Sequence, residues 1–409
     1  MTDLEQKPRL RFKGFTEAWE QRKLSDLTSM HARIGWQNLR TSEFLDSGNY
    51  MLITGTDFND GAINFSTCHY VERERYEQDR NIQIHNGSIL ITKDGTLGKV
   101  AYVQGLSMPA TLNAGVFNVQ IKDANNVDEK YLFQYLKAPF LMDYVDKKAT
   151  GGTIKHLNQS ILVDFPVILP QRSEQTLIGA FFQQLDNLIT LHQRKYEKLK
   201  SMKAALLEKM FPSENETTPK IRFKGFTEAW EQRKLDQVAS YRNGKAHENS
   251  IDSEGVYIVV NSKFVSTDGE VIKKSNEQIE PLFKNELAFV LSDVPNGRAI
   301  ARTFLVQKDG LYTLNQRIAG ITPSSDTCPY FLHILMNRNK YFLAFDDGAK
   351  QTNLSVKDVL EFEANYPNFK EQERIGALFD SLDVLITLHQ RKCEKLKNLK
   401  KSLLERMFI

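Results

Sequence analysis

The chain has 409 residues, of which 41% are hydrophobic and 26% are charged, and its net charge is +3. This length exceeds the usual size of a single core and predicts two or more domains. The composition excludes a disordered chain and a membrane-spanning one, because hydrophobicity is ordinary and no long apolar run occurs. A protein that binds DNA without partner subunits is usually more basic than this chain. Either DNA is not the partner, or other subunits supply much of the cationic surface.

The N-terminal residues MTDLEQKPRL do not resemble a signal peptide, so we expect the protein in the cytoplasm. The three cysteines, Cys68, Cys328 and Cys393, lie far apart and form no CxxC pair. Their spacing argues against a zinc site and against a disulfide framework. We therefore expect no metal.

A 14-residue segment, RFKGFTEAWEQRKL, occupies Arg11–Leu24 and recurs letter for letter at Arg222–Leu235. We call these two copies the opening segments. A second pair of matched segments ends at Phe211 and Phe408. The offset is 211 residues for the first pair and 197 for the second, so the second intervening region is shorter by 14. The chain is therefore an internal duplication. The matched opening and closing segments, which we call the frame, flank two regions whose sequences diverge.

The divergent regions, the heads, are predicted to be mixed α/β, since short β-rich runs precede one amphipathic helix in each. In the first head these runs are Tyr50–Thr54, Ser88–Thr92 and Val116–Ile121, and the helix is 129–147. In the second head they are Tyr257–Val260, Leu287–Leu291 and Arg317–Ile321, and the helix is 330–345.

One polar loop in each head follows the second of these strands. In the first head TKDGTLGKV places Lys93, Thr96 and Lys99 between glycines, where backbone amides and a cation can meet a phosphate. It lacks the P-loop spacing, and a structural turn explains it equally well. Its counterpart, SDVPNGRAI, offers Asn296 and Arg298, which suit bidentate contacts to adenine or guanine.

A second polar segment lies just before each head joins its long helix. GGTIKHLN contains Thr153, Lys155 and His156, and AKQTNLS contains Lys350, Gln351 and Thr352. Phosphate or base contacts would use such side chains, although loop solubility explains them as often.

A third pair of polar positions begins equivalent strands. These residues are Asn113 in TLNAGV and Asn315, Gln316 and Arg317 in TLNQRI. Equivalent positions with changed chemistry are expected of two modules that recognise different sequences.

The closing segments are predicted to be long helices, because seam residues recur at alternating steps of four and three. The first seam is Ile178, Phe182, Leu185, Ile189, His192, Tyr196, Leu199, Lys203, Leu206 and Met210. The second is Ile375, Phe379, Leu382, Ile386, His389, Cys393, Leu396, Lys400, Leu403 and Met407. Such a helix is roughly 50 Å long at about 1.5 Å per residue.

The linker PSENETTP is too short for a parallel return, so we expect an antiparallel helix pair with a head at each end. The C-terminus then returns near the first head. The seam histidines could bind ligands, but they more often set the register. An outer apolar row either packs on the heads or docks other subunits. Its members are Phe181, Leu188, Met202, Leu378, Leu385 and Leu399.

Catalytic motifs are absent from the sequence. It has no Pro-Pro dipeptide, FxGxG, HExxH or Walker A motif, and its only ExK lies in the N-terminal tail at Glu5 to Lys7. The sequence therefore predicts a chain that is not an enzyme.

The duplicated order of parts resembles the specificity subunit of a Type I restriction-modification enzyme. An RFKGF…W…KL opening precedes each variable segment, and a P-x3-EQ-x2-IG…LD…I helix closes it. The closing motif is Pro170, Glu174, Gln175, Ile178 and Gly179, and again Pro367, Glu371, Gln372, Ile375 and Gly376. The resemblance covers essentially the whole chain.

The resemblance implies two mixed α/β target-recognition domains joined by an antiparallel two-helix coiled coil, with a pseudo-two-fold internal repeat. The implied parts are recognition domains at 1–168 and 220–365, long helices at 169–211 and 366–409, and a linker at 212–219. Each domain would recognise half of an asymmetric, gapped site in double-stranded DNA, and the helices would act as a ruler.

The implied partners are two modification subunits, which hold S-adenosylmethionine and methylate adenine, and two restriction subunits, which use ATP and Mg²⁺. Two alternatives remain. A stand-alone DNA enzyme would modify or cleave DNA without added subunits, and a coiled-coil scaffold would show no sequence preference in a reconstituted complex.

Overall fold

The computed structural model describes residues 8–148, 157–213, 216–294 and 297–408. Contacts divide the chain into two units, Met1–Gln193 with Arg391–Ile409 (unit 1) and Arg194–Gln390 (unit 2). Both long helices cross this division, so each unit contains part of each helix. The predicted return of the chain's end to the first head is confirmed within unit 1.

Unit 1 contains two four-stranded sheets. The first has the order β2-β11-β8-β9 and is antiparallel throughout, and the second has the order β6-β3-β10-β7 with β3 and β10 parallel. The strands are β2 (Thr28–His31), β3 (Met51–Ile53), β6 (His69–Tyr70), β7 (Gln83–Ile84), β8 (Ile89–Thr92), β9 (Val100–Tyr102), β10 (Ala110–Leu112) and β11 (Val116–Ile121). Smaller elements are β4 (Phe58–Asn59), β5 (Ala62–Ile63), α1 (Leu24–Leu27), α2 (Arg73–Glu77) and α5 (Gln159–Val163).

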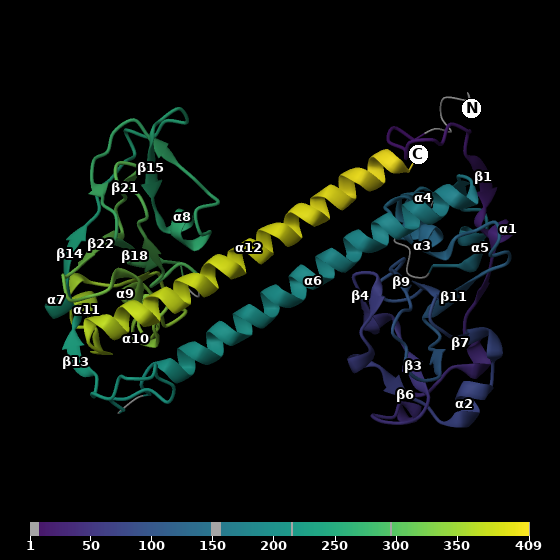
Figure 1. Ribbon diagram of the computed structural model, residues 1–409, viewed down its shortest axis with the longest axis horizontal. Helices are drawn as coiled ribbons and strands as arrows, with labels where there is room; N and C mark the ends of the chain where they lie inside the picture. The colour runs from purple at the N-terminus through teal and green to yellow at the C-terminus, as the bar shows by residue number, and fades with distance from the viewer. Residues whose placement is uncertain (1–7, 149–156, 214–215, 295–296, 409) are drawn as a thin grey trace. The chain divides into compact units, whose positions relative to one another are not determined.

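Unit 2 repeats this topology strand for strand, with the orders β14-β22-β18-β20 and β16-β15-β21-β17 (Figure 1). The strands are β14 (Ala239–Asn243), β15 (Tyr257–Val260), β16 (Lys274–Ser275), β17 (Pro281–Leu282), β18 (Leu287–Val290), β20 (Thr303–Leu305), β21 (Tyr312–Leu314) and β22 (Ile318–Pro323). Smaller elements are α7 (Leu235–Val238), α8 (Ser262–Ser266), β19 (Ser292–Asp293), β23 (Thr352–Asn353) and α11 (Val356–Leu360). The two heads therefore share a fold although their residues differ.

The two faces of the first sheet explain its β-rich sequences. In β11, Phe117 and Val119 pack on a core shared with the helices, whereas Val116 packs with Leu90 on a second core that includes residues of the other sheet. Both faces are covered, so four of the six residues of the strand are apolar. The six predicted strands are confirmed, and their ends agree with the observed ones to within two residues.

The single helix predicted late in each head is wrong in both cases, because each run forms two helices. In unit 1, α3 (Glu129–Lys137) ends before Pro139 and α4 (Phe140–Lys148) follows it. Proline lacks the amide that would continue the helix. In unit 2, α9 (Pro329–Met336) and α10 (Lys340–Leu343) are separated at Arg338, whose φ is 56°.

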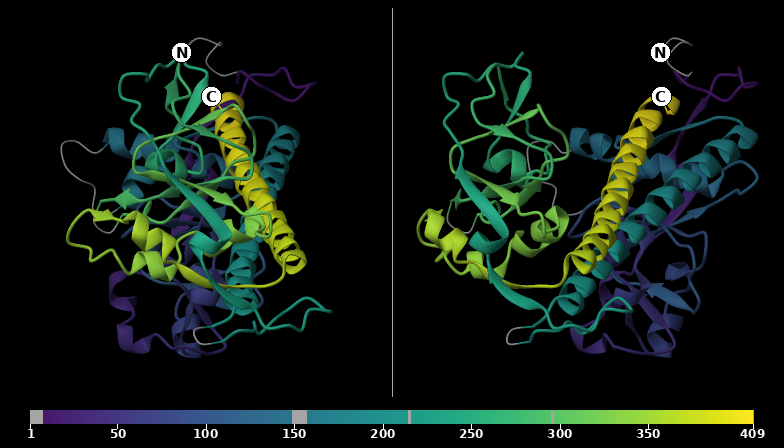
Figure 2. Two further views of the ribbon diagram at one scale, coloured as in Figure 1. Left: turned by 90° about the vertical axis from the view of Figure 1, so that its left-hand side faces the viewer. Right: turned by 60° about the vertical axis from the view of Figure 1, so that its left-hand side comes forward.

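The long helices α6 (Arg172–Met210) and α12 (Phe369–Met407) have 39 residues each. Within each unit they lie side by side in opposite chain directions (Figure 2). Lys400 pairs with Asp186 at 2.6 Å in unit 1, and Lys203 pairs with Asp383 at 2.5 Å in unit 2. Burial lowers the pKa of Lys400 to about 8. The predicted antiparallel pairing is confirmed within both units.

Each opening segment is tied to the start of a long helix by a buried ion pair. Arg11 donates two hydrogen bonds of 2.8 Å to Glu174, and Arg222 donates bonds of 2.7 and 2.8 Å to Glu371. Both carboxylates are fully buried. Such bidentate pairs combine charge with fixed geometry. Next to them, β1 (Glu20–Lys23) pairs with β12 (Pro166–Leu169), and β13 (Glu231–Lys234) pairs with β24 (Glu363–Tyr366).

The other residues of the closing motif have equally specific contacts. Gln175 donates to the Pro170 carbonyl at 2.8 Å and accepts from the Asp128 amide at 2.9 Å, just before α3. A Cβ on Gly179 would lie 2.7 Å from the Tyr131 amide nitrogen, so only glycine allows α6 to approach α3 this closely. The motif therefore joins the long helix to its head.

The residue just before each opening segment bonds the end of a long helix. The Leu10 amide donates to Arg406 at 2.8 Å, and the Ile221 amide donates to Lys209 at 2.8 Å. In unit 1, Phe408 is buried against Tyr131, Tyr135, Phe140 and Phe182. The C-terminal turn of α12 is therefore part of the core of unit 1.

We predict that Glu371→Ala destabilises unit 2 by about 3–5 kcal/mol, because it leaves the half-buried Arg222 guanidinium without a counter-charge. Urea unfolding of the full chain measures this change. The control is Glu361→Ala, which removes an exposed partner of Lys357 and is expected to cost about 0.5 kcal/mol or less. Equal effects of the two substitutions would show that the buried pair does not hold the unit together.

We predict that a circular permutant, opened between Ser213 and Thr218 and with Ile409 joined to the N-terminus by a flexible linker, folds like the parent chain. The reason is that the end of α12 already lies in unit 1. Circular dichroism and unfolding midpoints test this expectation. A permutant that fails to fold contradicts it.

Candidate nucleic-acid interface

In unit 2, polar loops that are distant in sequence meet at one end of the sheets. We call residues 244–248, 291–294, 297–302, 315–317 and 350–354 the loop cluster of unit 2. The Leu291 amide donates to Arg317 at 3.0 Å, the Gln316 amide to Lys245 at 2.9 Å and the Leu354 amide to Leu291 at 2.8 Å. Three of the predicted DNA-binding segments are therefore neighbours.

Unit 1 has the same arrangement. Its loop cluster comprises residues 54–57, 92–100, 113–115 and 157–158. The Lys93 amide donates to Gly115 at 2.9 Å, and the Leu157 amide donates to Lys93 at 2.8 Å. These bonds match those at Leu291 position for position, so the fold places equivalent loops together in both units.

The candidate side chains of unit 1 differ in exposure. Thr96 and Lys99 are exposed. Lys93 is half-buried, with its Nζ 5.5 Å from the centre of the Phe117 ring. Asn113 is also half-buried, and its side chain accepts a bond from the Ala114 amide. Thr153, Lys155 and His156 lie outside the described residues.

In unit 2 most candidates reach the surface. The exposed ones are Arg298, Gln316, Arg317, Lys350 and Gln351.

Three other candidates of unit 2 are less accessible or lie elsewhere. Asn315 is half-buried. Thr352 is buried, and its hydroxyl donates to Asp346 at 3.0 Å, so it supports the loop instead of facing solvent. Asn296 lies outside the described residues.

Residues that sequence analysis missed shape the loop around Arg298. The Asp293 carboxylate accepts bonds from the amides of Ala299 at 2.6 Å and Ile300 at 3.1 Å. The Arg338 guanidinium donates to the Ile300 carbonyl at 3.2 Å. A Cβ on Gly297 would lie 2.0 Å from Asp293 Oδ2, so any side chain there would displace the Asp293 carboxylate. The DG and NG dipeptides signalled turns in these loops, but no local pattern pointed to Arg338.

The neighbouring segment of the cluster is also held by a carboxylate. The amides of Ala349 and Lys350 donate to Asp347 at 2.9 and 3.2 Å, and these bonds lower the pKa of Asp347. The backbone that carries Lys350 is thus ordered while its side chain stays exposed.

A buried side chain in each unit anchors the segment after the first sheet strand. In unit 1, Arg33 is fully buried and donates to the Leu112 carbonyl at 3.0 Å and to Thr111 at 3.3 Å; burial lowers its pKa. In unit 2, His247 bonds Thr313 at 2.8 Å. Thr111 and Thr313 occupy equivalent strands, so different side chains make the same tether.

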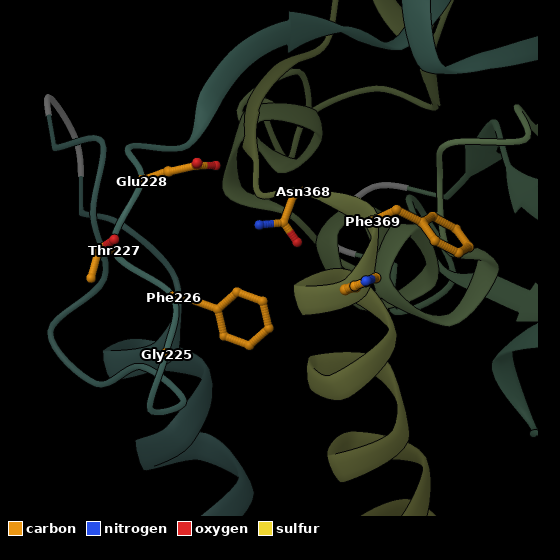
Figure 3. A pocket seen from close by; sticks show the side chains of 7 residues that line it. Gly225, Phe226, Thr227, Glu228, Asn368 and Phe369 are labelled. Atoms are coloured by element: carbon orange, nitrogen blue, oxygen red, sulfur yellow. The ribbon is translucent and has the colours of Figure 1, made fainter.

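The frame forms a hollow of about 460 Å³ in unit 2. It lies between the opening segment and the first turn of α12, and the side chains of Phe226 and Asn368 project into it (Figure 3). At the matching place in unit 1, the side-chain amide of Gln171 donates a hydrogen bond to the Glu17 carboxylate. The hollow is lined by frame residues and not by the divergent loops.

The interpretation that the outer apolar row packs on the heads holds for part of it. Phe181 packs edge-on against Phe12 at 6.0 Å, and Leu378 packs on the core of unit 2. Leu188, Met202, Leu385 and Leu399 remain 40–46% exposed. The helices thus carry apolar surface that their own units do not cover.

No described helix is long and apolar enough to cross a membrane. Over the same residues, no three His, Cys, Asp or Glu side chains gather as metal ligands.

The sequence profile of the Type I restriction modification DNA specificity domain matches residues 16–201 and 227–398, one match in each half of the chain. The chain belongs to this family. A specificity subunit is the DNA-recognition subunit of a Type I system and not its enzyme, so DNA and the restriction-modification complex are its partners.

Relatives and a solved structure are similar to this specificity subunit over most of its length. A putative type I restriction enzyme MjaX specificity subunit of Methanocaldococcus jannaschii is 22% identical and aligns over 95% of this chain and 92% of its own length. The MjaIX specificity subunit of the same organism is 24% identical over 78% of this chain and 76% of its own. The crystal structure of the S subunit from M. genitalium has a TM-score of 0.69 at 15% identity and covers 98% of this chain and 99% of its own. That likeness confirms the fold.

We predict that Gly244→Ala displaces the turn at 315–317, because the new Cβ would lie 2.0 Å from the Asn315 carbonyl oxygen. Overpacking of this kind typically costs about 1–3 kcal/mol. Thermal unfolding measures the loss. Gly35→Ala is the control, since nothing lies within 4 Å of its Cβ. If both variants melt alike, the turn does not depend on this close approach.

Proposed function

We propose that each loop cluster recognises one half of a bipartite, gapped DNA site. The observation that carries this proposal is that one topology places equivalent loops together in both units while their exposed side chains differ. Lys99 and Thr96 stand out in unit 1, whereas Arg298, Arg317 and Lys350 stand out in unit 2. Cations and amides of this kind suit phosphates and base edges. Different side chains at equivalent positions predict different half-sites.

The long helices are the proposed ruler between recognition domains at 1–168 and 220–365, with residues 212–219 as the linker. Each helix of 39 residues measures roughly 58 Å at about 1.5 Å per residue. Half-sites one helical turn or more apart, about 34–36 Å per turn, present their grooves on one face of DNA. The bases between them would stay unread.

The opening segments favour two copies of one partner. Of their 14 identical residues, only Trp19 and Leu24 in the first copy, and Trp230 and Leu235 in the second, are buried. Arg11 and Arg222 are explained by their ion pairs, and Phe12 and Phe223 by packing on the cores. The core does not require the identity of the exposed residues of the segments, but two docking sites for the same protein would. The exposed apolar residues of α6 and α12 repeat in the same way.

We assign these sites to two modification subunits, which would hold S-adenosylmethionine and flip and methylate adenine. Two restriction subunits would join the assembly and use ATP and Mg²⁺. The modest net charge of this chain fits that arrangement, because the partners would share the phosphate contacts.

The test maps methylated adenines in cells that express this chain with its modification subunit, before and after the head between residues 236 and 365 is replaced by that of another specificity subunit. We expect a gapped motif of which one half changes. The matched control replaces the first head, residues 25–168, and should change the other half.

Three outcomes would contradict the proposal. A continuous motif, or one that changes throughout, would refute the proposal that each head recognises one half-site. Absence of any sequence preference would favour a scaffold. Methylation by the purified chain alone would establish a stand-alone enzyme.

A further inference from the structure

Arg317 stands out in the backbone of unit 2. It lies in the turn between β21 and β22, and its φ is 65°. Residues with a Cβ adopt this left-handed region only at an energetic cost, because the Cβ crowds a carbonyl oxygen. In unit 1 the equivalent position, the residue before β11, is Gly115, which has no side chain to present.

The surrounding structure fixes this turn from three sides. The Arg317 carbonyl accepts from the Leu291 amide at 3.0 Å, the Gln316 amide donates to Lys245 at 2.9 Å and the Asn315 amide donates to Val260 at 3.1 Å. A strained conformation persists where neighbours determine it in this way, and such strain gathers at functional sites.

The Arg317 side chain has no structural use of its own within the described residues. It is exposed, and none of these residues accepts a hydrogen bond from its guanidinium. Arg338 makes the contrast, since its φ is also positive but its guanidinium supports the Ile300 carbonyl. The neighbouring Gln316 is engaged with Glu248 at 2.6 Å. The fold therefore presents the planar, five-donor guanidinium of Arg317 at the surface of the loop cluster.

We propose that Arg317 is a specificity-determining residue of unit 2 and that it recognises guanine. This inference rests on the proposed recognition of DNA by the loop clusters. A guanidinium matches the O6 and N7 acceptors of guanine in the major groove through two parallel hydrogen bonds. Unit 1 has glycine at the equivalent position, so the contact is specific to the half-site of unit 2.

The test uses the full chain with its modification subunit and duplexes that carry every single-base change in the mapped target. With Arg317→Gly we expect discrimination at one G·C pair in the half-site of unit 2 to fall by about ten-fold or more. The half-site of unit 1 should be unaffected. The melting temperature should be unchanged or higher, because glycine adopts the left-handed conformation freely.

Two further variants separate recognition from charge and from strain. Arg317→Lys keeps the charge but loses the planar fork, so overall DNA affinity should largely remain while guanine discrimination falls. Asn285→Gly relieves a left-handed residue (φ 72°) at the other end of β18, where it is exposed, and should leave the motif unchanged.

The outcomes distinguish the two proposals. If the parent chain shows no gapped motif, the proposed function fails. If the motif is present and Arg317→Gly leaves it intact, or if this variant lowers the melting temperature, Arg317 is not a specificity-determining residue. A lost preference for a base pair other than G·C overturns the assignment to guanine.

Discussion

Each unit depends on one buried, bidentate ion pair between its opening segment and its long helix. Arg11 with Glu174, and Arg222 with Glu371, join residues 163 and 149 positions apart in the chain. Burying such charges is costly unless every donor and acceptor is paired, so the pair tolerates only one docking geometry. The adjoining glutamine and glycine of the closing motif then seat the helix on the head. The repeated sequence motifs therefore encode the attachment of each long helix to its head.

The duplication makes two ion pairs between the long helices equivalent. Asp186 meets Lys400 in unit 1, and Lys203 meets Asp383 in unit 2; each residue of one pair corresponds to a residue of the other. A half-buried charge in a helical seam is stable only opposite its partner, which selects the antiparallel register over shifted ones. Each unit is consequently completed by the end of the other helix, as the buried Phe408 shows.

In each head the sheets determine the fold, whereas the loops carry the residues proposed to recognise DNA. The strand orders of their four-stranded sheets agree although the sequences differ, because a pattern of apolar strands is enough to specify the sheets. The loops are then free to vary, and the carboxylates of Asp293 and Asp347 hold their backbones. Side chains such as Arg298 and Lys350 remain exposed on this ordered backbone.

The sequence by itself determined the duplicated frame, the two long helices, the six main strands and the family, because these are local periodicities or repeated letters. It also located the polar loops. Only the tertiary structure decided that these loops are neighbours, that Thr352 is buried, that Arg338 interrupts the helix of the second head, and that Arg33 and His247 are anchors. Those facts depend on strand pairing between distant segments. The left-handed Arg317 is the clearest case, since its neighbours impose a conformation that its own sequence disfavours.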